Sequence, residues 1–440
     1  MTGDTTRAVG YFFVGSLAFF APLLEGRTSE TVAAVGTVAP FALVAAIAFV
    51  SRSGPVFELL ASGGDREEGR LYDLVSFALA GTALAVLYIG FELPLTAFIV
   101  AVFVLTAGDL TRTISEPRIG SPVVGAAVFA LAGTLAGTAA VLLAGVAGGT
   151  VPALPTVAFV AASGAVLGAL IRSALFRRDD PLVLLSTGLV VWFLLGLGVA
   201  PTTGRIAVGL AVTVALGYVA YALGTASVTG VLTGVLLALF AVVLGGYGWF
   251  VLLVTFFGLG GLASKYRYSE KLSRGIAQEN EGARGGGNVL ANSAVALAAV
   301  VAYAASGRVG VDPTVFQFVF SGAVAAALAD TFSSEFGGLF DSPRLITTLE
   351  PVDAGTDGGV TWQGAAAGAV GAAIIALLGA LFFGFDGAAT VAVLLAGFLG
   401  MVFDSFLGAT LEGGRVGNQG VNLLATLAAG LGAGAFVVLS

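Results

Sequence analysis

Long apolar runs recur from one end of this 440-residue chain to the other, and each is long enough to cross a lipid bilayer as a helix. The runs are continuous and rich in Ala, Val, Leu and Gly, whereas the strands of a membrane β-barrel would alternate apolar and polar residues. Charged residues make up only 10% of the chain, too few to cover the surface of a soluble protein. The sequence therefore predicts an all-α polytopic membrane protein.

About fifteen transmembrane helices can be placed, one of them at 182–200. With a cytoplasmic N-terminus, the loops and flanks on the cytoplasmic side hold every Lys and Arg except Arg27, Arg205 and Arg308. This asymmetry is the one expected of an integral protein of the cell membrane. It supports the helix count and the orientation together, because one missed span would scramble it.

Two modules are expected. Residues 1–210 would form an N-terminal membrane module of about seven helices with no assigned role, and residues 211–440 a domain of about eight helices. In the second module the orientation places three polar loops on the cytoplasmic side, at 264–287, 331–361 and 405–417.

The chain has no cysteine and no histidine, which excludes disulfides, thiolate nucleophiles, histidine bases and zinc sites of the Cys/His type. A bound metal would need oxygen ligands, as Mg²⁺ does. The formal net charge of −7 gives no reason to expect a nucleic-acid partner. The sequence does not set the oligomeric state.

Two predicted helices end in similar segments that carry carboxylates. One contains Asp330 and Glu335, and the other contains Asp404; in both, the Asp is followed by a hydroxyl residue and a Phe. A carboxylate at a membrane edge is costly unless it meets a cation or a hydrogen-bond donor. The two matching helix ends therefore mark a candidate site at which the carboxylates meet a cation or a donor. The alternative is that each carboxylate only reaches the lipid headgroups.

A second pair of segments, "ENEGARGGGNVLAN" and "LEGGRVGNQGVN", also match each other. Each has Glu-Gly-x-Arg, then glycines, then two Asn four residues apart at the start of a predicted helix. A helix start preceded by glycines exposes backbone N–H groups and can hold phosphate, and arginine adds a guanidinium fork. A flexible loop with an Asn cap is the alternative. The predicted phosphate-binding residues are Arg284, Gly286, Gly287, Asn288, Asn292, Arg415, Asn418 and Asn422.

Three other segments are less specific. The loop that carries Arg344, Gly358 and Gly359 could approach a phosphate closely, or it could be a plain connector. The basic run 265–274 is interpreted mainly as a membrane-surface and topology determinant. The segment 108–112, Gly-Asp-Leu-Thr-Arg, is interpreted as a degenerate relic or a structural helix end rather than a second active site.

The segments "ENEGARGGGNVLAN", "ADTFSSEFG", "SPRLITT", "GTDGGVTWQG" and "FDSFLGATLEG", in this order, resemble the integral membrane family that includes plant phytyl-phosphate kinase and animal transmembrane protein nineteen. The resemblance covers about 215–440. It implies a prenyl-phosphate kinase that transfers a phosphoryl group from CTP or another nucleoside triphosphate to an isoprenyl monophosphate such as phytyl or geranylgeranyl phosphate. The resemblance also implies that Asp330, Asp404 and Glu335 are catalytic residues that hold Mg²⁺. Mg²⁺, the nucleotide, the prenyl phosphate and membrane lipid would then be its ligands.

Other functions remain open on sequence alone. Paired polar helix ends could form the duplicated substrate site of a transporter, although transporter sites lie near the membrane midplane. A cytidylyltransferase acting on a lipid phosphate would use similar residues and release pyrophosphate. A purely structural membrane protein would bind neither metal nor nucleotide.

Overall fold

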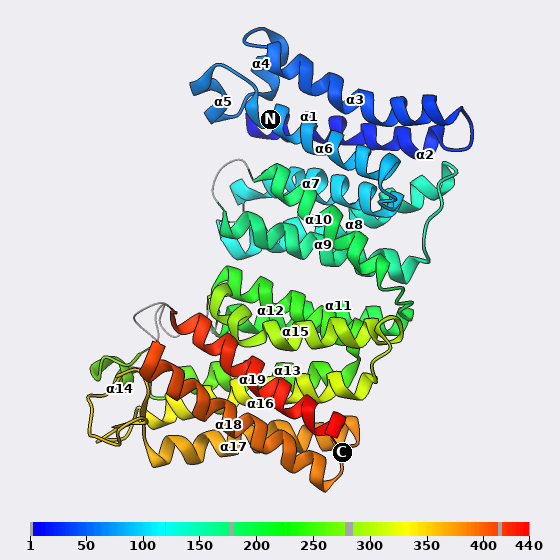
Figure 1. The fold of residues 1–440 in the computed structure, drawn as a ribbon. Helices are drawn as coiled ribbons and strands as arrows, with labels where there is room; N and C mark the ends of the chain where they lie inside the picture. Colours follow the sequence, from blue (N-terminus) through cyan, green and yellow to red (C-terminus); the bar gives the residue numbers. More distant parts are fainter. Residues whose placement is uncertain are drawn as a thin grey trace. The chain divides into compact units, whose positions relative to one another are not determined.

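The computed structural model describes residues 3–118, 120–175, 179–224, 226–277, 285–411 and 416–439. It is almost entirely helical (Figure 1). Fourteen stretches of helix within these residues are long and apolar enough to cross a membrane. The helix at the expected span 182–200 is Asp180–Gly196, which is apolar but only 17 residues long. The all-α polytopic class is therefore confirmed.

The chain divides into two compact units, Met1–Ile206 (unit 1) and Ala207–Ser440 (unit 2); the sequence places the boundary at 210. The helices and strands, in chain order, are α1 Gly3–Gly15, η1 Ser16–Phe19, α2 Phe20–Leu24, α3 Glu30–Val50, α4 Pro55–Leu60, α5 Gly63–Glu68, α6 Tyr72–Gly90, α7 Leu95–Ser115, η2 Glu116–Arg118, α8 Pro122–Val146, α9 Leu154–Ala174, α10 Asp180–Gly196, α11 Thr203–Ala222, α12 Val228–Phe240, η3 Ala241–Gly245, α13 Tyr247–Lys265, α14 Tyr268–Ser273, α15 Gly286–Val309, α16 Pro313–Gly337, β1 Arg344–Leu345, β2 Gly359–Val360, α17 Trp362–Phe383, α18 Gly387–Leu411 and α19 Asn418–Leu439.

Each unit is built around one buried helix. In unit 1 this is α7, which is buried continuously from Leu95 to Gly108 and packs against α1, α6, α8, α9 and α10. In unit 2 it is α16, whose residues Phe320 to Ala329 are all buried among α13, α15, α17, α18 and α19 (Figure 1). Because these two helices are buried on all sides, their sequences are apolar on every helix face.

Small residues let the neighbours of α16 come close. A Cβ added to Gly322 would stand 2.7 Å from the Ala429 carbonyl oxygen of α19, and one added to Gly371 of α17 would stand 2.9 Å from the Leu328 carbonyl oxygen. Helix packing through Gly and Ala is the usual solution in lipid, where the hydrophobic effect does not drive helices together. The many glycines of the sequence therefore serve packing in this unit.

Local signals set the ends of α16 and α17. The Asp312 side chain accepts a hydrogen bond from the backbone N–H of Thr314 at the start of α16, where Pro313 occupies the first helical position. Thr361 caps α17 by accepting from the N–H of Gly364, and it donates to the Gly337 carbonyl at the end of α16. This residue therefore joins the two helix ends.

Between α16 and α17 lies a compact loop with the antiparallel pair β1 and β2, in which Arg344 is opposite Val360 and Leu345 is opposite Gly359. We call the following set the polar end of unit 2: the C-terminal turns of α16 and α18, the first turns of α15 and α19, and this loop.

Candidate functional site

Asp330 and Asp404 lie near the C-terminal ends of α16 and α18, which run in the same direction because both pack antiparallel on α17. The Cβ of Ala326 lies 2.7 Å from the point that a Cβ on Gly400 would occupy. Each aspartate follows one of these two contact residues by four positions, about one helical turn. The two carboxylates therefore extend the same helix contact at the polar end, where both are partly buried and each interacts with other groups of the chain.

Glu335 has a partner within the chain that the sequence did not reveal. The Lys271 ammonium of α14 donates to Glu335 Oε2 at 2.6 Å and to the Ala263 carbonyl oxygen at 2.7 Å. The Lys271 and Glu335 side chains are only 1% and 4% exposed. The second carboxylate oxygen of Glu335 is buried and has no hydrogen-bond partner among the described residues. This geometry makes Glu335 one half of a buried ion pair that attaches α14 to the end of α16.

Three carboxylates were predicted to hold the metal, but Glu335 is paired with Lys271, which leaves Asp330 and Asp404. Within the part of the chain that the structure describes, no three carboxylates lie together in a group that could hold a metal ion. Mg²⁺ commonly takes only one or two protein carboxylates and completes its shell with water and substrate phosphates. Asp330 and Asp404 fit that mode of binding.

The two Asn-bearing helix starts lie side by side. A Cβ on Gly287 of α15 would stand 2.7 Å from the amide nitrogen of Gln419, the second residue of α19. The Asn292 amide donates to the Asn288 carbonyl at 3.0 Å, and the Asn422 amide donates to the Asn418 side-chain oxygen at 3.1 Å. The polar side chains of each pair thus share one helix face, as the four-residue spacing predicts.

Thr229 is a second residue of the site that the sequence analysis missed. Its hydroxyl accepts a hydrogen bond from the Gly286 N–H at 3.3 Å, so one N–H of the α15 start is already used within the chain. Two predicted phosphate ligands, Arg284 and Arg415, lie outside the described residues.

The loop residues have contacts of their own. Arg344 donates to the Leu349 carbonyl oxygen at 2.6 Å and so stabilises its own loop. Gly358 has φ +73°, and a Cβ there would stand 2.6 Å from the Ser405 carbonyl oxygen of α18. Gly359 pairs with Leu345 in the small sheet. Gly358 therefore brings the loop against α18 one residue beyond Asp404. The sequence analysis had interpreted this close approach as an approach to a ligand.

An apolar groove of about 510 Å³ runs along α18 and α19. Gly400, Phe403 and Phe406 of α18 line it, together with Gly432 of α19 and Ile346 of the loop. Phe403 directly precedes Asp404 in the chain, so the groove reaches the helical turn that carries this aspartate.

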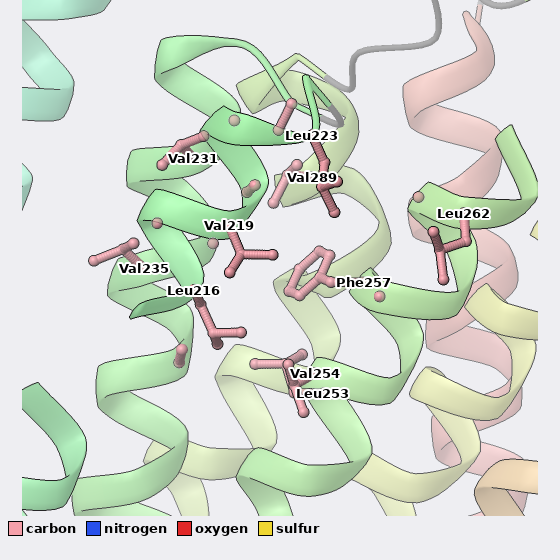
Figure 2. Close-up of a pocket in the computed structure, with 18 residues that line it drawn as sticks. Leu216, Val219, Leu223, Val231, Val235, Leu253, Val254, Phe257, Leu262 and Val289 are labelled. Atoms are coloured by element: carbon pink, nitrogen blue, oxygen red, sulfur yellow. The ribbon is translucent and has the colours of Figure 1, made fainter. Parts of the chain in front are cut away.

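A second apolar cavity, of about 280 Å³, lies among α11, α12, α13 and α15 (Figure 2). Figure 2 shows the Phe257 ring in this space, with Val219, Leu216 and Val254 around it. Val289, one position after Asn288, also lines it. Unit 2 thus offers an apolar space on each of two sides of its polar end.

Comparison with known proteins places these features in a family context. Residues 211–430, half of the chain, match the family described as integral membrane protein DUF92. An uncharacterized membrane protein of Methanocaldococcus jannaschii is 38% identical over 188 residues, which is 42% of this chain and 75% of that protein. An uncharacterized membrane protein of Synechocystis sp. is 33% identical over 176 residues, 38% of this chain and 65% of that protein. The chloroplastic protein VTE6 of Arabidopsis thaliana is 26% identical over 170 residues, 38% of this chain and 50% of that protein. No solved structure matches the chain.

Proposed function

Because the chain belongs to the integral membrane family DUF92, which the sequence analysis identified through its resemblance to plant phytyl-phosphate kinase, we propose that it is a membrane prenyl-phosphate kinase. It would transfer a phosphoryl group from a nucleoside triphosphate, with CTP as the first candidate, to an isoprenyl monophosphate. The observation that carries the proposal is the polar end of unit 2. There Asp330 and Asp404 extend one helix contact, two Asn-bearing helix starts lie side by side, and an apolar groove reaches the helical turn that carries Asp404.

The phosphates would be held at the starts of α15 and α19. Free N–H groups and the helix dipole favour an anion at a helix N-terminus, and two such ends lie next to each other here. Asn288, Asn292, Asn418 and Asn422 add side-chain amides on the same helices. The arginines at 284 and 415, which precede these helices in the sequence, would complete the phosphate site.

Asp330 and Asp404 would hold Mg²⁺, which when bound neutralises charge on the transferred phosphoryl group. Glu335 is already paired with Lys271, so its part in the proposal is to fix the end of α16 that carries Asp330. In the transfer, an oxygen of the prenyl phosphate forms a bond to the terminal phosphorus of the donor. The bond from that phosphorus to the bridging oxygen breaks, and the nucleoside diphosphate leaves with the electron pair. The attacking phosphate is already ionised, so the step needs no general base, in keeping with a chain without histidine.

The prenyl chain would lie in the groove along α18 and α19. The groove is lined by apolar side chains, and it meets the polar end at Phe403 and Ile346. An amphiphilic substrate placed there would have its phosphate beside Asp404 and its tail at membrane depth. The lysine and arginine distribution that predicts a cytoplasmic polar end would also give this site access to soluble nucleotides.

The test uses purified protein in detergent with Mg²⁺, CTP or ATP, and phytyl or geranylgeranyl monophosphate, with products identified by mass spectrometry. We expect prenyl diphosphate and a nucleoside diphosphate in equal amounts. Asp330→Asn should abolish both while the protein keeps its elution volume in size-exclusion chromatography. Turnover by a folded Asp330→Asn protein would contradict the metal-binding role of Asp330.

The same assay separates the other candidate functions. Release of pyrophosphate together with a cytidylylated lipid would identify a cytidylyltransferase. If no nucleotide gives a product, the kinase proposal fails, and transport of prenyl phosphate into liposomes becomes the next measurement.

A further inference from the structure

Unit 1 contains a polar cavity of about 490 Å³ at one end of its helices. Its lining comes from α1, α5, α6, α7, α9 and α10, including the Asp109 and Arg112 that the sequence analysis interpreted as a structural helix end. Ionisable groups within membrane segments are costly and are retained where they pair with one another or serve a ligand. A cavity lined by such groups therefore needs an explanation beyond packing.

An ion-pair network forms one wall of the cavity. Arg172 of α9 contacts Asp109 of α7 at 3.4 Å and Asp179 at 3.6 Å, and it also pairs with Asp180 at the start of α10. Arg112 contacts the same Asp109 oxygen at 3.1 Å. These contacts bring the ends of three helices together. The carboxylates therefore set the orientation of the Arg112 and Arg172 guanidinium groups.

Several buried polar atoms around the cavity remain without a partner in the described part of unit 1. The Tyr11 side chain, which is on α1 and is 8% exposed, has a buried hydroxyl with no hydrogen bond. The Nε atoms of Arg112 and Arg172 are also buried and lack an acceptor. Buried donors in native proteins nearly always have a partner. All three donors belong to residues that line one cavity, where a ligand with acceptor oxygens could pair with them after a small side-chain movement.

The charges of the lining residues limit the class of ligand that the cavity can bind. Carboxylates outnumber arginines among the described lining residues, with Asp4 and Asp73 adding to the aspartates of the network. An anion alone would be repelled by this excess of negative charge, and a cation alone would leave the donors unsatisfied. A phosphate group that carries a divalent cation meets both demands, because its oxygens accept from the donors while the cation faces the carboxylates.

We propose that the cavity of unit 1 is a second ligand site, which binds a phosphate group together with a divalent cation. This site uses none of the residues that carry the proposed kinase activity of unit 2, so either proposal can fail without the other. The competing view is that the ion pairs only join helix ends and that the cavity holds water.

The natural sequence has no cysteine, which allows a local measurement. Ser76 lines the cavity, and its hydroxyl donates to the Asp73 carbonyl of its own helix, so Ser76→Cys introduces one thiol there. The rate at which a small maleimide labels this thiol in the full-length protein is measured with inorganic pyrophosphate, with Mg²⁺, and with both. We expect labelling to slow only when both are present. Ser53→Cys, in an exposed loop of the same unit, should label at an unchanged rate.

Tyr11→Phe separates the two views without a risk to folding, because it removes only the hydroxyl. If that hydroxyl contacts the ligand, the Ser76→Cys protein should need several times more pyrophosphate for the same protection. Asp330→Asn, in unit 2, should leave the protection unchanged. Labelling that pyrophosphate and Mg²⁺ do not slow, or protection that is equal in Tyr11→Phe, would overturn the proposal.

Discussion

Replacing Lys271 with methionine removes one partner of a buried ion pair, and we expect it to lower the free energy of unfolding by about 3–5 kcal/mol. The magnitude follows from burial, since the Lys271 and Glu335 side chains are 1% and 4% exposed. After the change, the Glu335 carboxylate would remain in the interior with neither oxygen paired, because Oε1 already lacks a partner among the described residues. Water cannot reach the charge without opening the contact between α14 and α16.

Two further variants control this prediction. Asp341→Asn breaks an ion pair in the same region, between Arg274 and an aspartate that is 88% exposed, and it should cost only about 0–1 kcal/mol. The double variant Lys271→Met and Glu335→Met leaves no charge unpaired, and it should recover most of the loss. The difference between the single and the double variant isolates the cost of the uncompensated charge.

Unfolding by a denaturing detergent, followed by tryptophan fluorescence, gives these free energies; Trp249 is a buried reporter in unit 2. A loss for Lys271→Met no larger than that for Asp341→Asn would refute the reasoning. The stable double variant then tests the role of Glu335. If it still forms prenyl diphosphate, Glu335 does not take part in catalysis.

The remaining predictions concern glycines. Gly432→Leu should fill the α18 and α19 groove, since a Cβ there meets nothing within 4 Å, and should raise the KM for long prenyl phosphates more than for short ones. Gly234→Leu fills the other apolar cavity, again with nothing within 4 Å of the added Cβ, and serves as the matched control. A larger effect on KM from this variant would show that the prenyl tail binds in that cavity instead. Gly400→Leu should lower the thermal midpoint in detergent, because its Cβ would meet Ala326 and Ala429 at 2.7 and 2.8 Å, and an unchanged midpoint would contradict the close packing. Gly358→Ala should release the loop from α18, which limited proteolysis within 338–361 would detect, and equal protection in both proteins would count against the contact.

Hydrophobic periodicity and spacing determined much of what the sequence could predict. Apolar length predicts the spans, and among the described residues the segment expected at 182–200 forms a helix of only 17 residues. The four-residue spacing of Asn288 and Asn292, and of Asn418 and Asn422, correctly places each pair on one helix face. These properties depend on residues close together in the chain, where helix geometry alone decides the outcome.

Contacts between distant segments could not be predicted in this way. Lys271 lies in a run of charged residues typical of a membrane surface. It is buried because it pairs with Glu335, which is distant in the chain. The cavity around Asp109 is lined from six helices between α1 and α10, so no local motif marks it. For Gly358 the sequence correctly indicates a close approach, but it does not reveal that the neighbour is α18.

The packing of α16 has a consequence for how a substrate of the proposed kinase would be captured. Alanine and glycine have no side-chain rotamers to exchange. We therefore expect the part of α16 that packs against its neighbours through Ala325, Ala326 and Ala329 to be rigid. Asp330 directly follows this packed segment, so we expect its backbone to be as rigid as the core of the unit. Motion that admits and releases a substrate must then come from the peripheral loops. Slow amide exchange in α16 with fast exchange in 338–361 would be the signature of such an arrangement.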